Sequence, residues 1–395
     1  MALPNVSQRA GSVTIGIVAG EASGDALAAT LIRAVRERVP HARFVGVAGP
    51  RMEAAGCEPW FALETLSVGG FVEVLAHIPE ILKLRRALIA KLLATRIDLF
   101  IGVDAPDFNL SVEAKLKRAG VRTMHFVSPS IWAWRRERVH KIRRAVHRIL
   151  TLFPFELPIY EEANVPATFV GHPLARDVAA RGTRRSAREQ LKLGMAQAVF
   201  ALLPGSRIAE IETHGELLLR TAAMLHATRP DVRFLVPLAT RPTRDLFEAA
   251  IYRLGLEALP LTTLYGHATD ALRAADVALV ASGTATLEAA LARCPHVIYY
   301  RVNPVTAFIL RRKLLLPYVG LPNILAGRFV VPELLQEDAT VENLAQAIGN
   351  LYDDTVTRRR MEALFAGFGA SLALDTGRLA AEAVASELRV AGIAC

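Results

Sequence analysis

Short apolar runs rich in β-branched residues alternate with longer segments of helical periodicity along most of the chain. The first run is SVTIGIVA (12–19), and in the DALAATLIRAVRERV that follows it (25–39) apolar residues recur at helical spacing. Other runs of this type lead into further helix-like segments: RFVGVAG, DLFIGVD, RTMHFVS, HRILTLF and ATFVGH. This alternation predicts an α/β fold with a parallel sheet covered by helices on both faces.

The pattern restarts after the polar, arginine-rich stretch at 173–188, which we interpret as a linker. The strand-like runs of the second half are AVFALLP, VRFLVPLA, DVALVAS and HVIYY. We therefore predict two doubly wound domains, 1–172 and 173–355, with a ligand in the cleft outside the carboxyl ends of the strands. The tail from about 356 reads as helix and is predicted to pack back on the first domain.

Length and charge restrict the class of protein. A chain of 395 residues with 52% hydrophobic and 22% charged residues is globular and long enough for two domains. Its 47 Lys and Arg against 38 Asp and Glu give a net charge of +9, which attracts nucleic acid, an acidic membrane surface or phosphorylated small molecules.

Cysteine usage and hydropathy bear on the compartment. Cys57, Cys294 and Cys395 are far apart and form no C-x-x-C pair, so they indicate neither a zinc site nor a disulfide framework, and a reducing cytosol fits best. The first apolar run leads directly into Glu21 and Asp25, which is typical of an opening strand rather than a signal peptide. No uncharged apolar run reaches the roughly 18 residues that a membrane span needs, so we expect a soluble or membrane-surface protein.

Several common site motifs are absent from the sequence. No G-x-G-x-x-G follows a strand-like run, and G-K-[ST], H-E-x-x-H and G-x-S-x-G do not occur. These absences argue against a dehydrogenase, a P-loop kinase, a metalloprotease and an α/β-hydrolase. D-x-D is also absent, which removes the usual metal clamp for a nucleotide-sugar diphosphate.

Three turns that follow strand-like runs carry small and polar residues. VAGEASGDALA (18–28), with Glu21, Ser23 and Asp25, is either a plain strand-to-helix turn that Asp25 caps or a turn that approaches a ligand, and a cap alone would need only one polar residue. LLPGSRIAEI (202–211) places the segment 205–207, Gly-Ser-Arg, at a helix start, which favours an anion site. In DVALVASGTATLEAALA (276–292), Ser282, Gly283 and Thr284 permit close approach of a diphosphate. One turn later, Glu288 either binds ribose hydroxyls or is an ordinary solvated helix position. Two such turns in one domain indicate a bound nucleotide.

DLFIGVDAPDFNL (98–110) ends a buried run with Asp104 and Asp107 around a proline, just ahead of Asn109. In one interpretation these side chains cap the next helix. In the other, Asp104 accepts a proton in a reaction.

Basic and aromatic residues gather in three further segments. FVSPSIWAWRRERVHKIRRAVHR (126–148) holds Ser128, Trp132 and Trp134 beside a basic helix. This composition suits nucleic acid, a sugar face or an anionic lipid surface, or simply a solvated basic helix with tryptophans in the core. The apolar, basic stretches 71–93 and 299–327 either lie on a membrane or line an acyl pocket, or are core helices with snorkelling Arg and Lys.

Together these motifs resemble one family, lipid-A-disaccharide synthase (glycosyltransferase family 19), which acts in lipopolysaccharide assembly. The resemblance rests on motifs that occur in family order between residue 14 and about residue 337: VAGEASGD, FVGVAGPRM, GVDAPDFN, VSPSIWAWR, LLPGSR, ASGTATLE, LPNILAG and PELLQE. The nearest alternatives are a peptidoglycan N-acetylglucosaminyltransferase and a UDP-sugar epimerase, which carry a different glycine-rich signature after the first strand. A basic nucleic-acid-binding protein is the alternative from another class.

The resemblance implies a GT-B fold, in which two Rossmann-like domains, one for the acceptor and one for the UDP-sugar, face each other across a cleft. It implies an inverting transfer from UDP-2,3-diacylglucosamine to 2,3-diacylglucosamine 1-phosphate, giving the β-1,6-linked disaccharide 1-phosphate and UDP. It implies no cofactor, no metal and no nucleic-acid partner. The expected location is the cytoplasmic side of the inner membrane, bound peripherally, and the oligomeric state is left open, a homodimer included.

The resemblance also implies roles for individual residues. Asp104 is expected to be the general base, with Asp107 as an orienting residue or cap and Asn109 as a helix cap. The acceptor side is expected to include Glu21, Ser23, Asp25, Asp107, Ser128 and Trp132. The residues expected to bind UDP are Gly205, Ser206, Arg207, Ser282, Gly283, Thr284, Glu288, Asn323 and Gln336.

Overall fold

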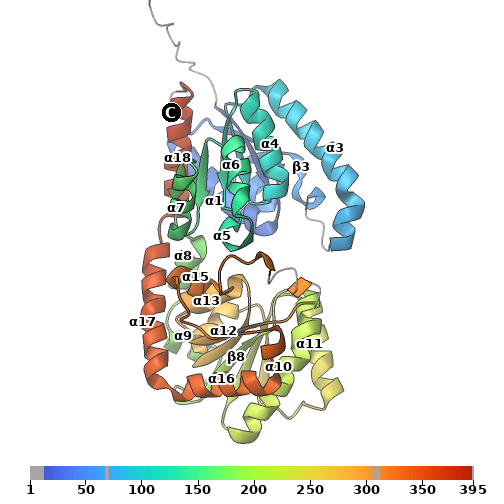
Figure 1. Cartoon of the computed structure of the whole chain (residues 1–395), viewed down its shortest axis with the longest axis vertical. Coiled ribbons are helices and arrows are strands. Elements are labelled where there is room, and N and C mark those ends of the chain that lie inside the picture. Colours follow the sequence, from blue (N-terminus) through green and yellow to red (C-terminus); the bar gives the residue numbers. More distant parts are fainter. Residues whose placement is uncertain (1–12, 67–70, 304–305, 308–311, 394–395) are drawn as a thin grey trace, which may run out of the picture. The chain divides into compact units, whose positions relative to one another are not determined.

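The computed structural model describes residues 13–66, 71–303, 306–307 and 312–393 of the chain (Figure 1). The chain forms two compact units. The first unit contains Met1–Pro173 together with Leu374–Cys395, and the second contains Leu174–Ala373.

The first unit is built on a seven-stranded parallel sheet of order β3-β2-β1-β4-β5-β6-β7. Its strands are β1 (Thr14–Ala19), β2 (Arg43–Ala48), β3 (Cys57–Ala62), β4 (Leu99–Val103), β5 (Arg122–Phe126), β6 (Arg148–Thr151) and β7 (Ala167–Phe169). Its α-helices are α1 (Ala22–Arg38), α2 (Pro50–Ala54), α3 (Phe71–Thr95), α4 (Pro106–Arg118), α5 (Ile131–Trp134), α6 (Val139–Ala145), α7 (Leu157–Glu162) and α18 (Thr376–Val390). Short 3₁₀ turns are η1 (Leu63–Thr65), η2 (Arg136–Arg138) and η3 (Pro154–Glu156).

The second unit repeats this plan with a six-stranded parallel sheet of order β10-β9-β8-β11-β12-β13. Its strands are β8 (Val199–Leu203), β9 (Arg233–Leu238), β10 (Leu261–Tyr265), β11 (Val277–Ala281), β12 (His296–Tyr300) and β13 (Glu333–Leu335). Its helices are α8 (Pro173–Ala180, which begins at the unit boundary), α9 (Arg184–Gln190), α10 (Ile208–Thr228), α11 (Arg241–Leu254), α12 (Ala268–Ala274), α13 (Thr284–Leu291), α15 (Leu321–Ala326), η4 (Gln336–Asp338), α16 (Val341–Asp353) and α17 (Thr355–Leu372).

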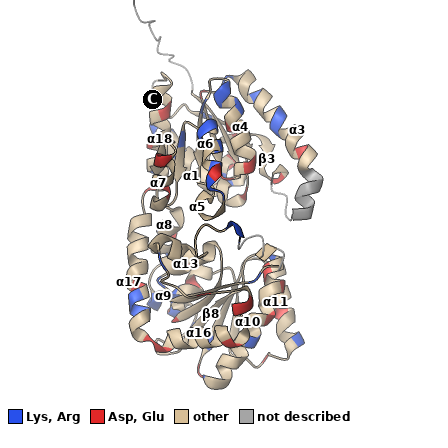
Figure 2. Ribbon diagram, viewed as in Figure 1, with Lys and Arg blue, Asp and Glu red and all other residues tan. Residues whose placement is uncertain are grey.

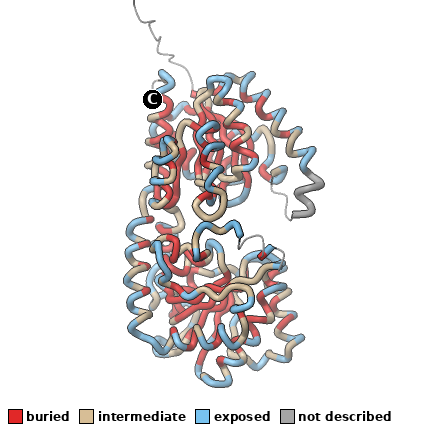
Figure 3. The backbone as a smooth tube through the Cα atoms, in the orientation of Figure 1, coloured by how far each residue is buried: buried red, intermediate tan, exposed pale blue. Residues whose placement is uncertain are grey.

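Burial explains why the strand sequences are almost continuously apolar. Every residue of β4, β8 and β11 is buried, as expected for parallel strands that helices cover on both faces (Figure 3). On one face of the first sheet, Phe100 packs with residues of α3 and α4, such as Leu88, Leu92 and Val112. The predicted α/β architecture, with strands and helices in alternation, is confirmed in both units.

Strand order determines where ligands meet such sheets. In each unit the order reverses direction next to the first strand, between β1 and β4 and between β8 and β11. Parallel sheets leave a crevice at such a switch point, outside the carboxyl ends of the strands. In the first unit Ala19, Val103 and Phe126 lie side by side at this edge, and in the second unit Leu203 pairs with Val280.

The end of the chain divides differently from the prediction. We expected the whole tail from about 356 to pack on the first domain, but the boundary lies after Ala373. Helix α17 belongs to the second unit because its apolar face, including Met361 and Phe365, joins that unit's core. Only α18 returns to the first unit, where it packs along α1.

None of the helices in the described part of the chain is long and apolar enough to cross a lipid bilayer. Basic side chains occur on helices of both units, for example on α3 and α6 of the first unit and on α17 of the second (Figure 2).

Candidate functional site

Asp104 stands at the carboxyl end of β4, in the crevice of the first unit. Asp104 and Ala105 both have left-handed backbone conformations, with φ of 54° and 42°. Two such non-glycine residues in a row are costly, roughly 1–2 kcal/mol each, so tertiary contacts must hold them. The Asp104 N–H donates to the Phe126 carbonyl at 2.8 Å, and the Asp104 carbonyl accepts from the Asn109 side chain at 2.8 Å. Its half-buried carboxylate has no hydrogen bond or ion pair to any residue that the structure describes.

The predicted caps of the following helix are wrong. The N-cap of α4 is Ala105, and no side chain caps this helix. Asn109 lies inside α4 and is fully buried. Its side-chain amide donates a hydrogen bond to the carbonyl of Asp104, the residue that follows β4. Asp107 is exposed in the first turn and forms an ion pair with Arg138 of η2. Both residues therefore fix the surroundings of Asp104, by contacts that sequence spacing does not reveal.

The turn after β1 supplies the residues on the other side of this crevice. Glu21 and Ser23 are exposed at the start of α1. A Cβ placed on Gly24 would lie 3.8 Å from the Cβ of Asp104, so this first turn approaches Asp104 closely.

Asp25 has a structural task that differs from the prediction. Its buried carboxylate accepts from the backbone N–H groups of Gly49 (3.2 Å), Arg51 (3.0 Å) and Met52 (3.0 Å). It thus caps α2, a helix that begins 25 residues later in the sequence, and not its own helix. Because three backbone N–H groups already bind this carboxylate, we do not retain Asp25 as a residue that contacts the acceptor substrate.

Ser128 and Trp132 follow β5 at the same edge of the sheet and are half-buried. The Ser128 hydroxyl lies 2.6 Å from the Tyr160 hydroxyl, and Trp132 Nε1 donates to Glu156 Oε1 at 3.2 Å. Burial raises the pKa of Glu156 to about 7. Trp132, one of the predicted acceptor-side residues, is thus held by an acid that the prediction left out.

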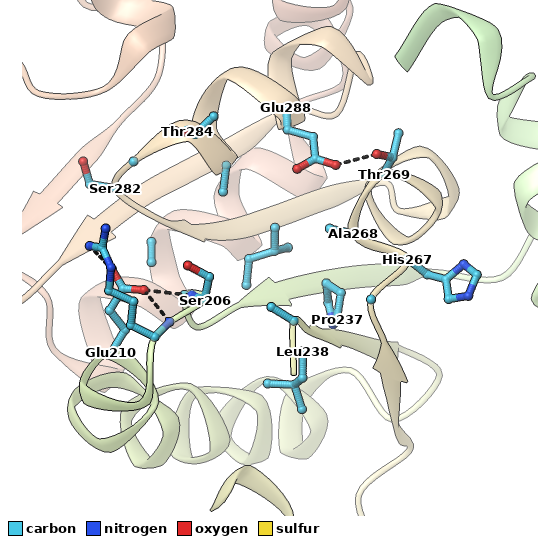
Figure 4. A pocket seen from close by; sticks show the side chains of 18 of the residues that line it. Ser206, Glu210, Pro237, Leu238, His267, Ala268, Thr269, Ser282, Thr284 and Glu288 are labelled. Carbon is cyan, nitrogen blue, oxygen red and sulfur yellow. Dashed lines mark hydrogen bonds and ion pairs between the residues drawn. The ribbon is translucent and has the colours of Figure 1, made fainter. Parts of the chain in front are cut away.

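A cavity of about 600 Å³ lies at the switch point of the second unit (Figure 4). Its walls come from the turns after β8, β9, β10 and β11. Seven of the nine residues predicted to bind UDP line it: Gly205, Ser206, Arg207, Ser282, Gly283, Thr284 and Glu288. The volume is in the range of small-molecule and cofactor sites.

In the Gly-Ser-Arg turn of this cavity, the backbone N–H groups are already bound by a glutamate of the helix that follows. Glu210 Oε2 accepts from the backbone N–H groups of Ser206 (2.8 Å) and Arg207 (3.1 Å), as Figure 4 shows. A side chain on Gly205, whose φ is 119°, would collide with this carboxylate. The amides that we predicted to bind phosphate therefore already have an acceptor. What the turn offers an anion is the guanidinium of Arg207, whose side chain is 81% exposed.

The turn after β11 is more open. Gly283 has a φ of 144°, and nothing lies within 4 Å of where its Cβ would be. Helix α13 begins at Thr284 with no side-chain cap, so its first N–H groups have no acceptor within the helix. Glu288 accepts a hydrogen bond from the buried Thr269 on the facing helix α12. The cavity thus combines an uncapped helix start, a feature that favours anions in general, with a carboxylate one turn further along.

Asn323 and Gln336 have partners elsewhere. Asn323 is fully buried and donates to the Val331 carbonyl and to Glu333, while its own oxygen accepts from Val330 and Val331. Gln336 pairs with the backbone of Val302. Neither residue lines the cavity, and we do not retain them as UDP ligands.

Two acids that sequence reasoning missed share one signal. Glu156 and Glu210 each occupy the third position of a helical turn and accept from the N-cap backbone N–H, at Phe153 and Arg207. An acid at that position is one half of a capping box, but the Ser or Thr N-cap that marks the motif in a sequence is absent, because the N-caps are Phe153 and Arg207. Among the described residues, no group of three or more His, Cys, Asp or Glu side chains could hold a metal ion.

Comparison with known proteins shows which family the chain belongs to. A family model described as lipid-A-disaccharide synthetase matches residues 15–377. The chain belongs to the lipid-A-disaccharide synthase family. A member from Chromobacterium violaceum, named lipid-A-disaccharide synthase, is 51% identical over 377 residues, which cover 95% of this chain and 98% of that one. The chain is therefore a glycosyltransferase, as its motifs led us to expect.

Solved structures establish the fold of this family member as GT-B. MurG from Acinetobacter baumannii superposes with a TM-score of 0.53 at 15% identity, covering 96% of this chain and 99% of that one. A co-structure of S. aureus MnaA with UDP superposes with a TM-score of 0.58 at 12% identity, covering 95% and 96%. At these identities the likeness concerns the fold alone.

Proposed function

We propose that the chain transfers the 2,3-diacylglucosamine group of UDP-2,3-diacylglucosamine to the 6-hydroxyl of 2,3-diacylglucosamine 1-phosphate. The products are the β-1,6-linked disaccharide 1-phosphate and UDP. The observation that carries the proposal is the cavity of the second unit in a member of this family, with an open helix start beside a carboxylate. The UDP in the S. aureus co-structure shows that a protein of this fold binds that nucleotide.

The second unit is assigned the donor. The first N–H groups of α13 and the guanidinium of Arg207 are placed to neutralise the diphosphate. Negative charge grows on the β-phosphate as the glycosidic bond breaks, so these groups stabilise the departing UDP. Glu288, held by Thr269, is the acceptor for ribose hydroxyls.

The first unit is assigned the acceptor. The donor is an α-glycoside and the product a β-glycoside, so one displacement inverts the anomeric carbon and requires one base for the 6-hydroxyl proton. Asp104 is that base, because its carboxylate has no partner among the described residues and stands at the carboxyl edge of the sheet. Glu21, Ser23, Ser128 and Trp132 surround the acceptor there.

We further propose that the enzyme works on its acylated substrates at the inner face of the cytoplasmic membrane. Helix α3 supports this, because Ile78 is 41% exposed and Lys83 and Arg86 are exposed on the same helix. Exposed apolar and basic side chains together favour an anionic lipid surface.

Release of UDP from UDP-2,3-diacylglucosamine, with and without the acceptor, tests the reaction. We expect release that depends on the acceptor, and an Asp104→Asn enzyme with kcat lowered by roughly 10²–10⁴ and an unchanged Kd for UDP. Asp107→Asn, which alters an exposed carboxylate three residues away, is expected to lose less than about tenfold. Lack of UDP release in the presence of acceptor rejects the reaction. A near wild-type kcat for Asp104→Asn rejects the base alone.

A further inference from the structure

The segment 127–135 runs directly beside Asp104. Strands β4 and β5 are neighbours, Val103 is paired with Phe126, and the Asp104 N–H donates to the Phe126 carbonyl. The segment leaves β5 at Val127, whose φ is 80°. A left-handed conformation is costly for a β-branched residue, so the path of this segment depends on contacts made further along it.

The buried side chain of Glu156 contacts the segment at Trp132. Only 2% of its surface is exposed. Its Oε1 accepts from Trp132 Nε1 at 3.2 Å, and its Oε2 accepts from the Phe153 N–H at 3.1 Å. One carboxyl group therefore joins the middle of the segment to the backbone just after β6.

The Trp132 ring that Glu156 holds belongs to an aromatic surface formed by Trp132, Phe153 and Phe155 at this edge of the sheet. The rings of Trp132 and Phe155 meet edge to face with centroids 5.4 Å apart, and Phe155 stacks on Phe153 at 5.3 Å. Trp132 and Phe155 remain half-buried, so part of each ring is open to a ligand. Aromatic faces bind the apolar faces of sugars and acyl chains.

We infer that Glu156 is a positioning residue of the acceptor site, which fixes Trp132 so that this aromatic surface meets the acylated sugar beside Asp104. The inference rests on the proposed function, which places the acceptor there. A carboxyl group suits the task because its two oxygens accept from two different directions. A glutamine has only one acceptor oxygen, so one of the two N–H donors loses its partner.

Capping the Phe153 N–H would by itself explain why a glutamate is buried here. The experiment therefore separates this structural role from the positioning of Trp132. Kinetics of the full chain are compared for wild type, Glu156→Gln, Trp132→Phe and the double variant. Trp132→Phe removes the bond to Glu156 and leaves the cap intact. The control is Glu162→Gln, which breaks an exposed ion pair between Arg136 of η2 and α7.

We expect Glu156→Gln to raise the KM for the acceptor roughly tenfold, as for one lost buried hydrogen bond, with the KM for the donor and the Kd for UDP unchanged. Trp132→Phe should raise the acceptor KM at least as much. Because Glu156 acts on the acceptor through Trp132, the double variant should be no worse than the worse single variant. Glu162→Gln should change the acceptor KM by less than twofold.

An acceptor KM within twofold of wild type in folded Glu156→Gln overturns the inference, and so do fully multiplied effects in the double variant. If near-UV circular dichroism shows that Glu156→Gln does not fold, Trp132→Phe decides, and an unchanged acceptor KM in that variant overturns the inference. Wild-type enzyme that releases no UDP with acceptor rejects the proposed function instead, so the two failures are distinguishable.

Discussion

Acids that bind backbone N–H groups explain much of the geometry at the two candidate sites. Asp25 caps α2, Glu156 caps η3 and Glu210 caps α10, and each satisfies N–H groups that have no acceptor within the helix. For Glu210 this has a chemical consequence, because it adds negative charge beside the proposed diphosphate site. Arg207, which lies 4.0 Å from Glu210, offsets that charge.

The raised pKa of Glu156 predicts a pH-dependent stability of the first unit. Burial raises this pKa from 4.5 to about 7, so the folded protein holds a proton that the unfolded chain releases. The resulting stabilisation is complete below pH 4.5 and is lost as the pH rises through 7. Glu156→Gln cannot titrate. From pH 5 to pH 8 we therefore expect wild type to lose up to about 3 kcal/mol in the free energy of unfolding relative to this variant.

Urea unfolding followed by tryptophan fluorescence measures this difference, because Trp60, Trp132 and Trp134 all lie in the first unit. His147 and His172, whose pKa values burial lowers to about 4, titrate in both proteins and cancel in the comparison. A difference that stays constant between pH 5 and pH 8 would contradict the prediction.

At the scale of elements, α18 is the part of the tail that returns to the first unit. It packs along α1, and its buried Glu387 pairs with Arg122 at the start of β5 and Arg148 at the start of β6. Burial raises the pKa of Glu387, but hydrogen bonds from the two arginines outweigh it and hold the pKa below its ordinary value. This contact ties the last helix to the amino ends of the strands, at the edge opposite Asp104.

Glu387→Ala is therefore expected to destabilise the first unit by roughly 3 kcal/mol, because it leaves two arginines, each only a quarter exposed, without their partner. Glu382→Ala on the same helix is the matched control. Glu382 pairs with Arg38 and Arg378 at the surface, and its loss should cost less than about 1 kcal/mol. Equal shifts of the urea midpoint in the two variants would contradict the assigned role of Glu387.

At the scale of the whole molecule, the two units differ in continuity. The second unit is one uninterrupted stretch, and every residue of its hydrophobic core cluster comes from that stretch. The first unit needs residues from both ends of the chain. Folding of the second unit is therefore expected to be independent of the rest of the chain.

A fragment of residues 174–373 is accordingly expected to unfold cooperatively and to bind UDP with a Kd within about threefold of the full chain. In that fragment Arg207→Ala should weaken UDP binding by at least roughly tenfold, as for a lost charge-assisted hydrogen bond. Calorimetric titration with UDP and urea unfolding measure both. A fragment that folds and does not bind UDP would contradict the assignment of the donor to this unit.

The sequence by itself determined the architecture, the family and the positions of the turns that form the two crevices. The spacing of apolar residues indicates which face of a single strand or helix is buried. The alternation of strands and helices along the chain indicates parallel sheets, with the functional turns at the carboxyl edge. Asp104, Arg207 and Glu288 were predicted as site residues in this way, because strand ends are visible in the sequence.

The tertiary structure alone decided which polar groups at those turns are free and which are bound. Asp25 is bound by a helix that starts 25 residues later, Asn323 by a neighbouring strand, and the amides after Gly205 by Glu210. A hydrogen bond depends on distance and direction between two groups, and separate elements bring most of these groups together. Spacing along one segment therefore identifies the candidates for a site, while packing between segments selects among them.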